Sequence, residues 1–346
     1  MRVTLKDIAR ETGLSITTVS LVLNNKPNKI SEKTKKIIFE ITEKLNYHPN
    51  QLAVGLAKRE TKTIGLIIPD ISNHFFAELA LGIDDEAHKH DRNIIFSNTS
   101  DKTERDISSL NILYSRGVDA IIIAMASDID NEKRRLYQKI ISDISIPIVL
   151  VDRYDPAFNC SSVKLNNKKG AYIATSHLLS LGHRKIACIT GAIGLRSTEE
   201  RMEGFRWAFK DFGIDVCEDY VYEGNYLHSG GYDAVKKIIK TPVTAIFAFN
   251  DMMAFGAIRM LHQAGLQIPN DISVIGFDDI YFSELLDVPL TTVRQPAYEI
   301  GCEAVRRAII EIENKNISKQ NIFFEPELII RKSTGKYKER EKNENT

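Results

Sequence analysis

From Thr63 onward, short apolar runs alternate with longer stretches in which apolar positions follow a helical period. The apolar runs predict buried strands at 64–68, 93–96, 120–123 and 146–151, and a second series at 185–189, 245–248 and 273–277. A helix from residue 75 to about residue 90 follows the first strand. Strands that alternate with helices indicate parallel sheets covered by helices on both faces. Two such series predict an α/β body of two lobes, each a doubly wound parallel sheet, with a cleft between them.

The first 46 residues have the pattern of three short helices, expected at 5–11, 16–24 and 32–45. Thr4, Ser15 and Ser31 are suited to cap their amino ends, and Gly13 breaks the chain between the first two helices. The apolar residues predicted to face inward are Leu5, Ile8, Ala9, Val19, Val22, Leu23, Ile37, Ile38, Ile41 and Leu45. Two helices joined by a short turn with glycine form a helix-turn-helix, whose second helix enters the DNA major groove. The N-terminal head is therefore expected to be an all-α DNA-binding domain.

The charge distribution agrees with this division. The 346 residues contain 46 basic and 46 acidic residues, but the first sixty hold eleven basic and six acidic residues. A head of net charge +5 on a body of net charge −5 suggests a module that binds a polyanion. No apolar run approaches the roughly 18–20 residues of a membrane span, and the N-terminus lacks the apolar segment of an export signal. The four widely spaced cysteines fit reduced thiols in the cytoplasm and show no metal-ligand spacing.

A short apolar stretch at 51–57 connects the head to a polar linker at 58–62. This stretch is too short to be a stable isolated helix in water, so we expect it to fold when it meets DNA. Leu56 is then placed to wedge between base steps of the minor groove, as apolar side chains of minor-groove proteins do.

Three groups of residues, in this order along the chain, resemble a known family: Val3-Thr4-Leu5-Lys6-Asp7-Ile8-Ala9, Thr18-Val19-Ser20 with Leu23-Asn24, and Tyr47-His48-Pro49-Asn50. With them the chain is similar to the lactose-repressor (LacI/GalR) family of bacterial transcription regulators over residues 2 to about 334. It departs from the family at Leu21 and Val54, where arginine is frequent. Leu21 can touch a thymine methyl but cannot donate to guanine, and Val54 removes a minor-groove cation.

The resemblance implies domain boundaries and a set of DNA contacts. The head is expected at 1–48, a hinge helix and linker at 49–62, the body at 63–334 and a flexible tail at 335–346. Lobe 1 would cover about 63–162 and 295–324, and lobe 2 about 163–293 and 326–334, with crossings near 160–165, 291–295 and 325. The tail lacks heptad leucines, which argues against a tetramerising helix. The expected DNA contacts are Thr4, Ser15, Ile16, Thr17, Thr18, Ser20, Leu21, Asn24, Asn28, Tyr47, Asn50, Ala53 and Leu56.

Ligands of open α/β sheets bind beyond the carboxyl ends of the strands, so the residues that follow each predicted strand are candidates. They are Asn73, Phe75, Phe76, Asp152, Arg153, Arg201, Tyr226, Asn250, Asp278 and Gln295. Aromatic rings offer stacking faces, while carboxylates, guanidinium groups and amides match the hydroxyl groups of a sugar. This set is similar, position by position, to a ribose-binding pocket, and in these residues the chain is closest to ribose-operon repressors.

These observations predict a cytoplasmic, nucleoid-associated repressor that binds a pseudo-palindromic operator as a homodimer and is released by a sugar. The alternatives are a global catabolite-control regulator whose corepressor is a phosphorylated carrier protein, and a purine-responsive repressor. The basic head argues against a transport binding protein. An enzyme is disfavoured because no phosphate-binding glycine loop or nucleophile–base pair is found, and no metal or cofactor is expected.

Overall fold

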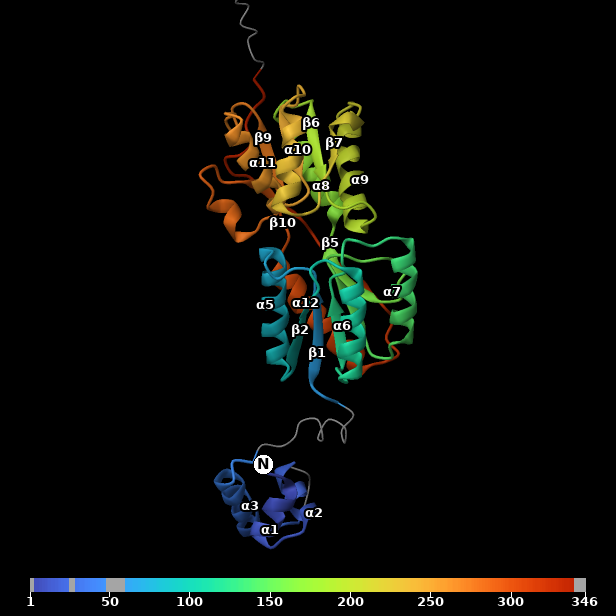
Figure 1. Ribbon diagram of the computed structural model, residues 1–346, viewed down its shortest axis with the longest axis vertical. Coiled ribbons are helices and arrows are strands. Elements are labelled where there is room, and N and C mark those ends of the chain that lie inside the picture. Colours follow the sequence, from blue (N-terminus) through green and yellow to red (C-terminus); the bar gives the residue numbers. More distant parts are fainter. Residues whose placement is uncertain (1–2, 25–28, 48–59, 339–346) are drawn as a thin grey trace, which may run out of the picture. The chain divides into compact units, whose positions relative to one another are not determined.

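The computed structural model describes residues 3–24, 29–47 and 60–338. The chain divides into two compact units, Met1–Thr61 and Lys62–Thr346 (Figure 1). Among the described residues, no helix is both long and apolar enough to cross a membrane. The expected combination of a helical head and a two-lobed α/β body is confirmed.

The head consists of α1 (Leu5–Thr12), α2 (Ile16–Leu23) and α3 (Glu32–Lys44). Ser15 accepts a hydrogen bond from the backbone N–H of Thr18 at 3.0 Å, and Ser31 accepts one from Thr34 at 3.2 Å. The head core consists of five buried residues: Ile8, Ala9, Val19, Val22 and Ile38. Side-chain caps and an apolar stripe therefore determine where each helix begins and which face it buries.

One expected core residue of the head is on the surface. Ile37 is 41% exposed, whereas its neighbour Ile38 is fully buried. Adjacent residues of an α-helix point about 100° apart, so α3 can turn only one of the two toward the small core. Leu5, Leu23, Ile41 and Leu45 are partly buried around this core.

The body contains two six-stranded sheets, one in each lobe. The first sheet has the order β11-β5-β4-β3-β1-β2 and is parallel throughout. Its strands are β1 (Thr63–Ile68), β2 (Asn93–Asn98), β3 (Ala120–Ile123), β4 (Ile148–Val151), β5 (Ser161–Leu165) and β11 (Asn321–Phe324). The second sheet has the order β12-β10-β9-β8-β6-β7, and only the β10–β12 pair is antiparallel. Its strands are β6 (Ile186–Thr190), β7 (Val221–Glu223), β8 (Ala245–Ala248), β9 (Ser273–Asp278), β10 (Thr291–Arg294) and β12 (Glu327–Ile329).

Helices cover both faces of each sheet, as Figure 1 shows. Lobe 1 carries α5 (His74–Lys89), α6 (Thr103–Ser115), α7 (Asn131–Asp143) and α12 (Ala297–Glu313). Lobe 2 carries α8 (Asn167–Ser180), α9 (Arg196–Asp211), α10 (His228–Ile238), α11 (Asp251–Gln263) and two short 3-10 helices, η1 (Glu218–Tyr220) and η2 (Tyr281–Glu284). Along β1, Leu66 faces the core under α5 and α12, while Ile67 faces the core under α6 and α7. Burial on both faces explains why the central strands are almost continuously apolar.

The chain passes three times between the two sheets. It leaves the first sheet after Leu165, returns after Arg294, and passes again between Phe324 and Glu327. We expected lobe 2 to begin at residue 163, but β5 pairs with both β4 and β11 and belongs to lobe 1 as far as Leu165. These crossings bring the carboxyl ends of both sets of parallel strands to the same cleft.

The end of the body differs from the expected tail. Residues 335–338 lie against lobe 2, where the backbone N–H of Gly335 donates to Ser273 Oγ at 3.0 Å and that of Tyr337 donates to the carbonyl of Leu181 at 2.8 Å. The flexible tail was expected to begin at residue 335, and these contacts join Gly335 and Tyr337 to lobe 2. The rest of that segment, 339–346, lies outside the described residues.

Candidate functional site

All ten residues predicted from strand ends line one cavity between the two lobes. Lobe 1 provides Asn73 before α5, Phe75 and Phe76 within it, and Asp152 and Arg153 after β4. Lobe 2 and the second crossing provide Arg201 on α9, Tyr226 after β7, Asn250 before α11, Asp278 at the end of β9, and Gln295 after β10. Ser197 on α9 also lines the cavity and was not predicted.

The cavity is narrow. The centre of a water-sized sphere can occupy only about 20 Å³, which is room for about one water molecule. A larger molecule therefore requires the lobes or the lining side chains to move apart. Two larger hollows, of about 450 and 470 Å³, lie at the amino ends of the strands of lobes 1 and 2. Because ligands of parallel α/β sheets bind beyond the carboxyl ends, the narrow interlobe cavity is the better candidate.

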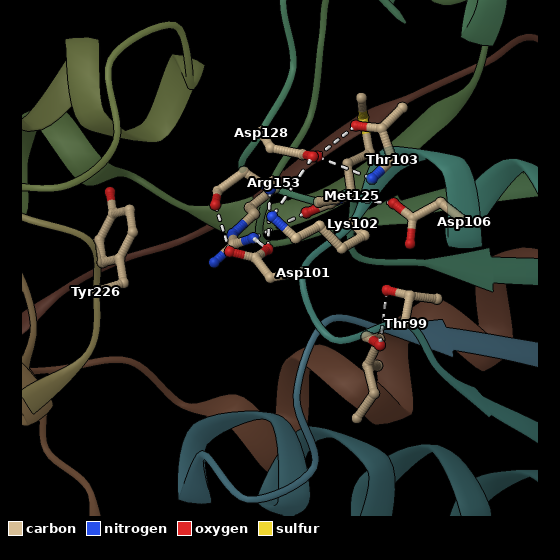
Figure 2. A network of polar contacts seen from close by, with 12 residues as sticks. Thr99, Asp101, Lys102, Thr103, Asp106, Met125, Asp128, Arg153 and Tyr226 are labelled. Atoms are coloured by element: carbon tan, nitrogen blue, oxygen red, sulfur yellow. Dashed lines mark hydrogen bonds and ion pairs between the residues drawn. The ribbon is translucent and has the colours of Figure 1, made fainter.

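Arg153 occupies the centre of the lobe 1 wall. Its Nη1 donates to Asp101 Oδ1 at 2.5 Å and to the carbonyl of Met125 at 3.0 Å. Its guanidinium carbon lies 5.5 Å from the ring centres of both Phe76 and Tyr226. In Figure 2 the guanidinium lies between the Asp101 carboxylate and the Tyr226 ring. The Arg153 cation thus lies close to one aromatic ring of lobe 1, Phe76, and one of lobe 2, Tyr226.

Arg201 is the corresponding cation of lobe 2. Its Nε donates to Asn167 Oδ1 at 2.8 Å, its Nη1 donates to the carbonyl of Phe249, and its guanidinium carbon lies 3.7 Å from the centre of the Phe277 ring. All three partners belong to lobe 2, so Arg201 is held by one lobe while it faces the other.

Aromatic side chains form opposite walls of the cavity. Phe75 and Phe76 meet edge to face, with ring centres 5.2 Å apart, and both are almost completely buried. Tyr226 has a φ of +60°, which is rare for a bulky residue, and its carbonyl accepts a hydrogen bond from Asn250 Nδ2 at 2.9 Å. Its hydroxyl lies 2.6 Å from that of Thr198.

Two carboxylates of the cavity are fully enclosed. Burial raises the pKa of Asp152, although Arg153 and Arg201 oppose the shift. Burial raises the pKa of Asp278 well above its usual range, with Arg201 again opposing. Gln295 Nε2 donates to Asp278 Oδ1 at 2.7 Å, while Gln295 Oε1 has no hydrogen-bond partner among the described residues. The cavity thus offers both acceptors and donors in a setting from which water is largely excluded.

The head contains the other group of predicted contacts. At the start of α2, Ile16 and Thr17 are exposed, whereas Thr18, Ser20 and Leu21 are partly buried. Thr4 and Ser15 are exposed caps of α1 and α2. The predicted DNA contacts Asn28, Asn50, Ala53 and Leu56, and the departure from the family at Val54, lie outside the described residues.

Asn24 and Tyr47, like Ser15 and Thr18, also make contacts within the head. Asn24 Nδ2 donates to the carbonyl of Ser20 at 2.8 Å, which ties this side chain back to α2. Tyr47 packs against the small core of the head.

Asp101 is the main polar neighbour of the cavity that the sequence reading missed. It lies three residues beyond the end of β2, a strand that the sequence predicted. The rule that found Asp152 after β4 applies equally to β2, and it would have singled out Asp101. Ser197 and Thr198 lie in the first turn of α9, where nothing in the sequence marks them.

Two family models match the chain. Residues 4–50 match the model described as bacterial regulatory proteins, lacI family, and residues 175–334 match a periplasmic binding protein-like domain. The HTH-type transcriptional regulator DegA of Bacillus subtilis is 36% identical over 96% of this chain and 98% of its own length. Catabolite control protein A of Priestia megaterium is 35% identical over 96% of this chain and all of its own.

Solved structures show the same architecture. A LacI family transcriptional regulator from Enterococcus faecium with bound ribose matches with a TM-score of 0.71 and 30% identity, over 80% of this chain and all of its own. The lac repressor dimer bound to operator and the anti-inducer ONPF matches with a TM-score of 0.85 and 25% identity, over 97% of this chain and all of its own.

Proposed function

The chain belongs to the LacI family of bacterial regulatory proteins, and we propose that it is a repressor whose operator binding is relieved by a sugar in the interlobe cavity. Its relatives are named transcriptional regulators and not enzymes. The chain is accordingly a ligand-responsive transcriptional regulator, and the proposal concerns its effector, its DNA contacts and its assembly.

The observation that carries the effector proposal is the convergence of the ten predicted residues on one cavity. Two cations, two carboxylates and three amides surround it, with aromatic rings on opposite sides. A monosaccharide has apolar C–H faces for the rings and hydroxyl groups that both donate and accept. A related regulator of 30% identity was solved with bound ribose, which supports D-ribose or a close relative as the effector.

We assign DNA reading to α2, the second helix of the head. Ile16 and Thr17 present exposed side chains at its amino end, where recognition helices contact base edges. Leu21 adds an apolar contact suited to a thymine methyl group. The basic residues of the head would neutralise phosphates and position the helix. The solved relative bound to operator supports this use of the head.

A homodimer fits the apolar surface of the body. Leu81 on α5 and Phe96 on the edge strand β2 are 55% and 43% exposed. Tyr281 and Phe282 on η2 are more than half exposed, and their rings approach that of His74 at the start of α5 with centres 6.0 and 5.6 Å apart. This contact places two exposed aromatic rings of lobe 2 beside the start of α5 in lobe 1. Large apolar surfaces and open sheet edges are places where a second copy binds.

The effector acts through the arrangement of the lobes. A sugar changes operator affinity only if it binds one arrangement more tightly than the other. We propose that the arrangement favoured by sugar is the one that releases the operator. The opposite sign, a sugar that tightens DNA binding, would identify a corepressor.

A panel of D-ribose, other pentoses, hexoses, their phosphates and purines tests the effector. Trp207, the single tryptophan of the chain, is on α9 with Arg201 and reports binding by its fluorescence, while light scattering measures the mass of the dimer. An operator selected from a random DNA pool then gives the effect of each binder on DNA affinity. D-ribose is expected to raise the melting temperature and weaken DNA binding. A response to purines alone identifies the purine alternative, and DNA binding that needs a phosphorylated carrier protein identifies the catabolite-control alternative.

A further inference from the structure

Asp101 contacts Arg153 from the loop after β2, outside the eleven residues that line the cavity. We propose that Asp101 is a positioning residue of the interlobe site, which fixes the guanidinium of Arg153 so that its remaining N–H groups face a sugar hydroxyl. This inference rests on the proposed sugar-binding function and adds a residue through which the site would obtain its selectivity.

The contacts of Arg153 fix its orientation as well as its charge. Its Nη1 has two acceptors, Asp101 Oδ1 at 2.5 Å and the Met125 carbonyl at 3.0 Å. The guanidinium is planar, so two acceptors on one nitrogen, together with the rings of Phe76 and Tyr226 at 5.5 Å from its carbon, restrict the orientation of the group. The side chain is only 8% exposed, which leaves it little freedom to adopt another orientation.

Asp101 is itself held in place from several directions. One carboxylate oxygen accepts a hydrogen bond from the Ser127 backbone N–H at 2.9 Å, and the other accepts one from the Ser127 hydroxyl. Its own backbone N–H donates to the Pro69 carbonyl at 3.0 Å. Burial opposes ionisation, but Arg153 and Ser127 nevertheless hold the pKa of Asp101 below its usual value. Asp101 is therefore an ionised, fixed acceptor.

The backbone at Asp101 has an uncommon conformation. Ser100 and Asp101 have φ values of +53° and +57°, two consecutive non-glycine residues in the left-handed region. Such conformations persist where the surrounding structure enforces them, and they concentrate at functional sites. Here the turn directs the Asp101 carboxylate at Arg153 and Ser127 together.

Neutralisation of the buried Arg153 charge does not by itself explain why Asp101 lies beside the guanidinium. Arg153 already has a carboxylate beside it, because Asp152 Oδ2 lies 3.9 Å from its Nε. Asp152 lines the cavity, whereas Asp101 reaches the guanidinium from the loop side and uses a direct hydrogen bond. The two carboxylates thus have different roles. With Arg153 fixed by Asp101, the site favours a sugar that has a hydroxyl group at the position facing the guanidinium over a sugar that lacks it.

A mutant cycle on the full-length dimer tests the proposal, with D-ribose and 2-deoxy-D-ribose as ligands in calorimetry. Asp101→Ala and Arg153→Ala are each expected to raise the Kd for D-ribose at least tenfold. The double variant should bind no more weakly than Arg153→Ala alone, since Asp101 acts only through Arg153. Asp101→Asn keeps acceptor oxygen for Arg153 and Ser127, so it is expected to restore part of the affinity and supplies a milder variant if alanine prevents folding.

Selectivity separates positioning from a purely structural role. We expect Asp101→Ala to reduce severalfold the ratio of the Kd for 2-deoxy-D-ribose to the Kd for D-ribose. A structural defect would instead weaken the binding of both sugars by the same factor. Asp128→Asn is the matched control, because Asp128 is in the same network but bonds Thr103 and Lys133 instead of Arg153 (Figure 2). It should leave the Kd within twofold of the wild type.

The outcomes that overturn the proposal are distinct from those that overturn the proposed function. Additive losses in the cycle, or an Asp101→Ala variant with the affinity and selectivity of the wild type, refute the positioning role while sugar binding stands. A wild-type protein that binds no sugar of the panel refutes the proposed function, and the positioning role falls with it.

Discussion

The hydroxyl of Tyr226 lies 2.6 Å from that of Thr198, and the ring that carries it lies directly over Gly191. A Cβ atom at position 191 would lie 1.9 Å from Cζ of Tyr226, far inside van der Waals contact. The absence of a side chain at Gly191 therefore sets how far the ring withdraws from the interlobe cavity. The sequence does not predict this contact, because 35 positions separate Gly191 and Tyr226.

Gly191→Ala is expected to push the Tyr226 ring toward the cavity and to raise the Kd for D-ribose at least tenfold. Gly191 does not have a positive φ, so backbone strain does not contribute to the effect. In a Tyr226→Ala background the same glycine substitution should have little further effect, because the ring it displaces is gone. Calorimetry on the two single variants and the double variant measures this, and equal losses in both backgrounds would rule out the steric explanation.

Asp106→Asn is expected to stabilise the protein at pH 8 more than at pH 5. Burial raises the pKa of Asp106 to about 6, above its usual value near 4, so the folded protein binds this proton more tightly than the unfolded chain. The free energy of unfolding therefore falls as the pH rises from about 4 to about 6 and stays lower above that range. Asparagine retains an oxygen for the Ala126 N–H and the Tyr137 hydroxyl without the buried charge.

The expected gain for Asp106→Asn at pH 8 is on the order of 3 kcal/mol, because the pKa of Asp106 rises from its usual value near 4 to about 6 and one pKa unit corresponds to about 1.4 kcal/mol. Calorimetric melting of both proteins at the two pH values measures it. Asp128→Asn is the control of opposite sign, because Lys133 and Thr103 hold the pKa of Asp128 below its usual value even though burial opposes this. An equal gain for Asp106→Asn at both pH values would show that its ionisation is not the cause.

Ser15→Ala and Ser31→Ala should each cost about 1 kcal/mol of head stability, because each removes an N-cap hydrogen bond. Only Ser15 caps α2, so only Ser15→Ala is expected to weaken operator binding beyond its effect on folding. Circular dichroism melts of the full chain, followed by DNA titration well below the melting temperature, separate the two effects. Matching DNA affinities for the two variants would exclude α2 as the reading helix.

Leu21→Arg is expected to change the preferred base from thymine toward guanine at one position in each operator half-site. An arginine can donate two hydrogen bonds to guanine, a discrimination worth roughly 1–3 kcal/mol. Selection from a random DNA pool with the wild type and the variant measures the preference. A general gain in DNA affinity without a change of preferred base would instead indicate a phosphate contact.

The central strands of the body, the edge strand β2, helix α5 and the three head helices were predictable, whereas β5 was not. The strands β1, β3, β4, β6, β8 and β9 are buried on both faces and therefore continuously apolar. In contrast, β5 contains Ser161, Ser162 and Lys164, which read as a polar loop although all three are buried. Lys164 Nζ lies 2.9 Å from the centre of the Tyr154 ring and 3.2 Å from Glu200 Oε1, so tertiary partners satisfy a charge that the local sequence leaves unexplained.

The candidate site was predictable to the extent that it follows strand ends. All ten predicted residues line the cavity because topology alone brings the carboxyl ends of parallel strands together. Asp101 follows a strand end and obeys the same rule, but the contacts of Thr198 and Gly191 were not predictable, because these residues act through distances that no sequence spacing encodes. Ile37 shows the same limit in the head, where a helical period cannot decide between two adjacent isoleucines.

The space between the lobes, with room for about one water molecule, has a kinetic consequence. A metabolite cannot enter by diffusion alone, because entry waits until the two halves of the body separate. Above a certain metabolite concentration the rate of association is then limited by the protein's own opening frequency and becomes independent of supply. Release requires the same opening, so the rate of opening would limit dissociation as well as association.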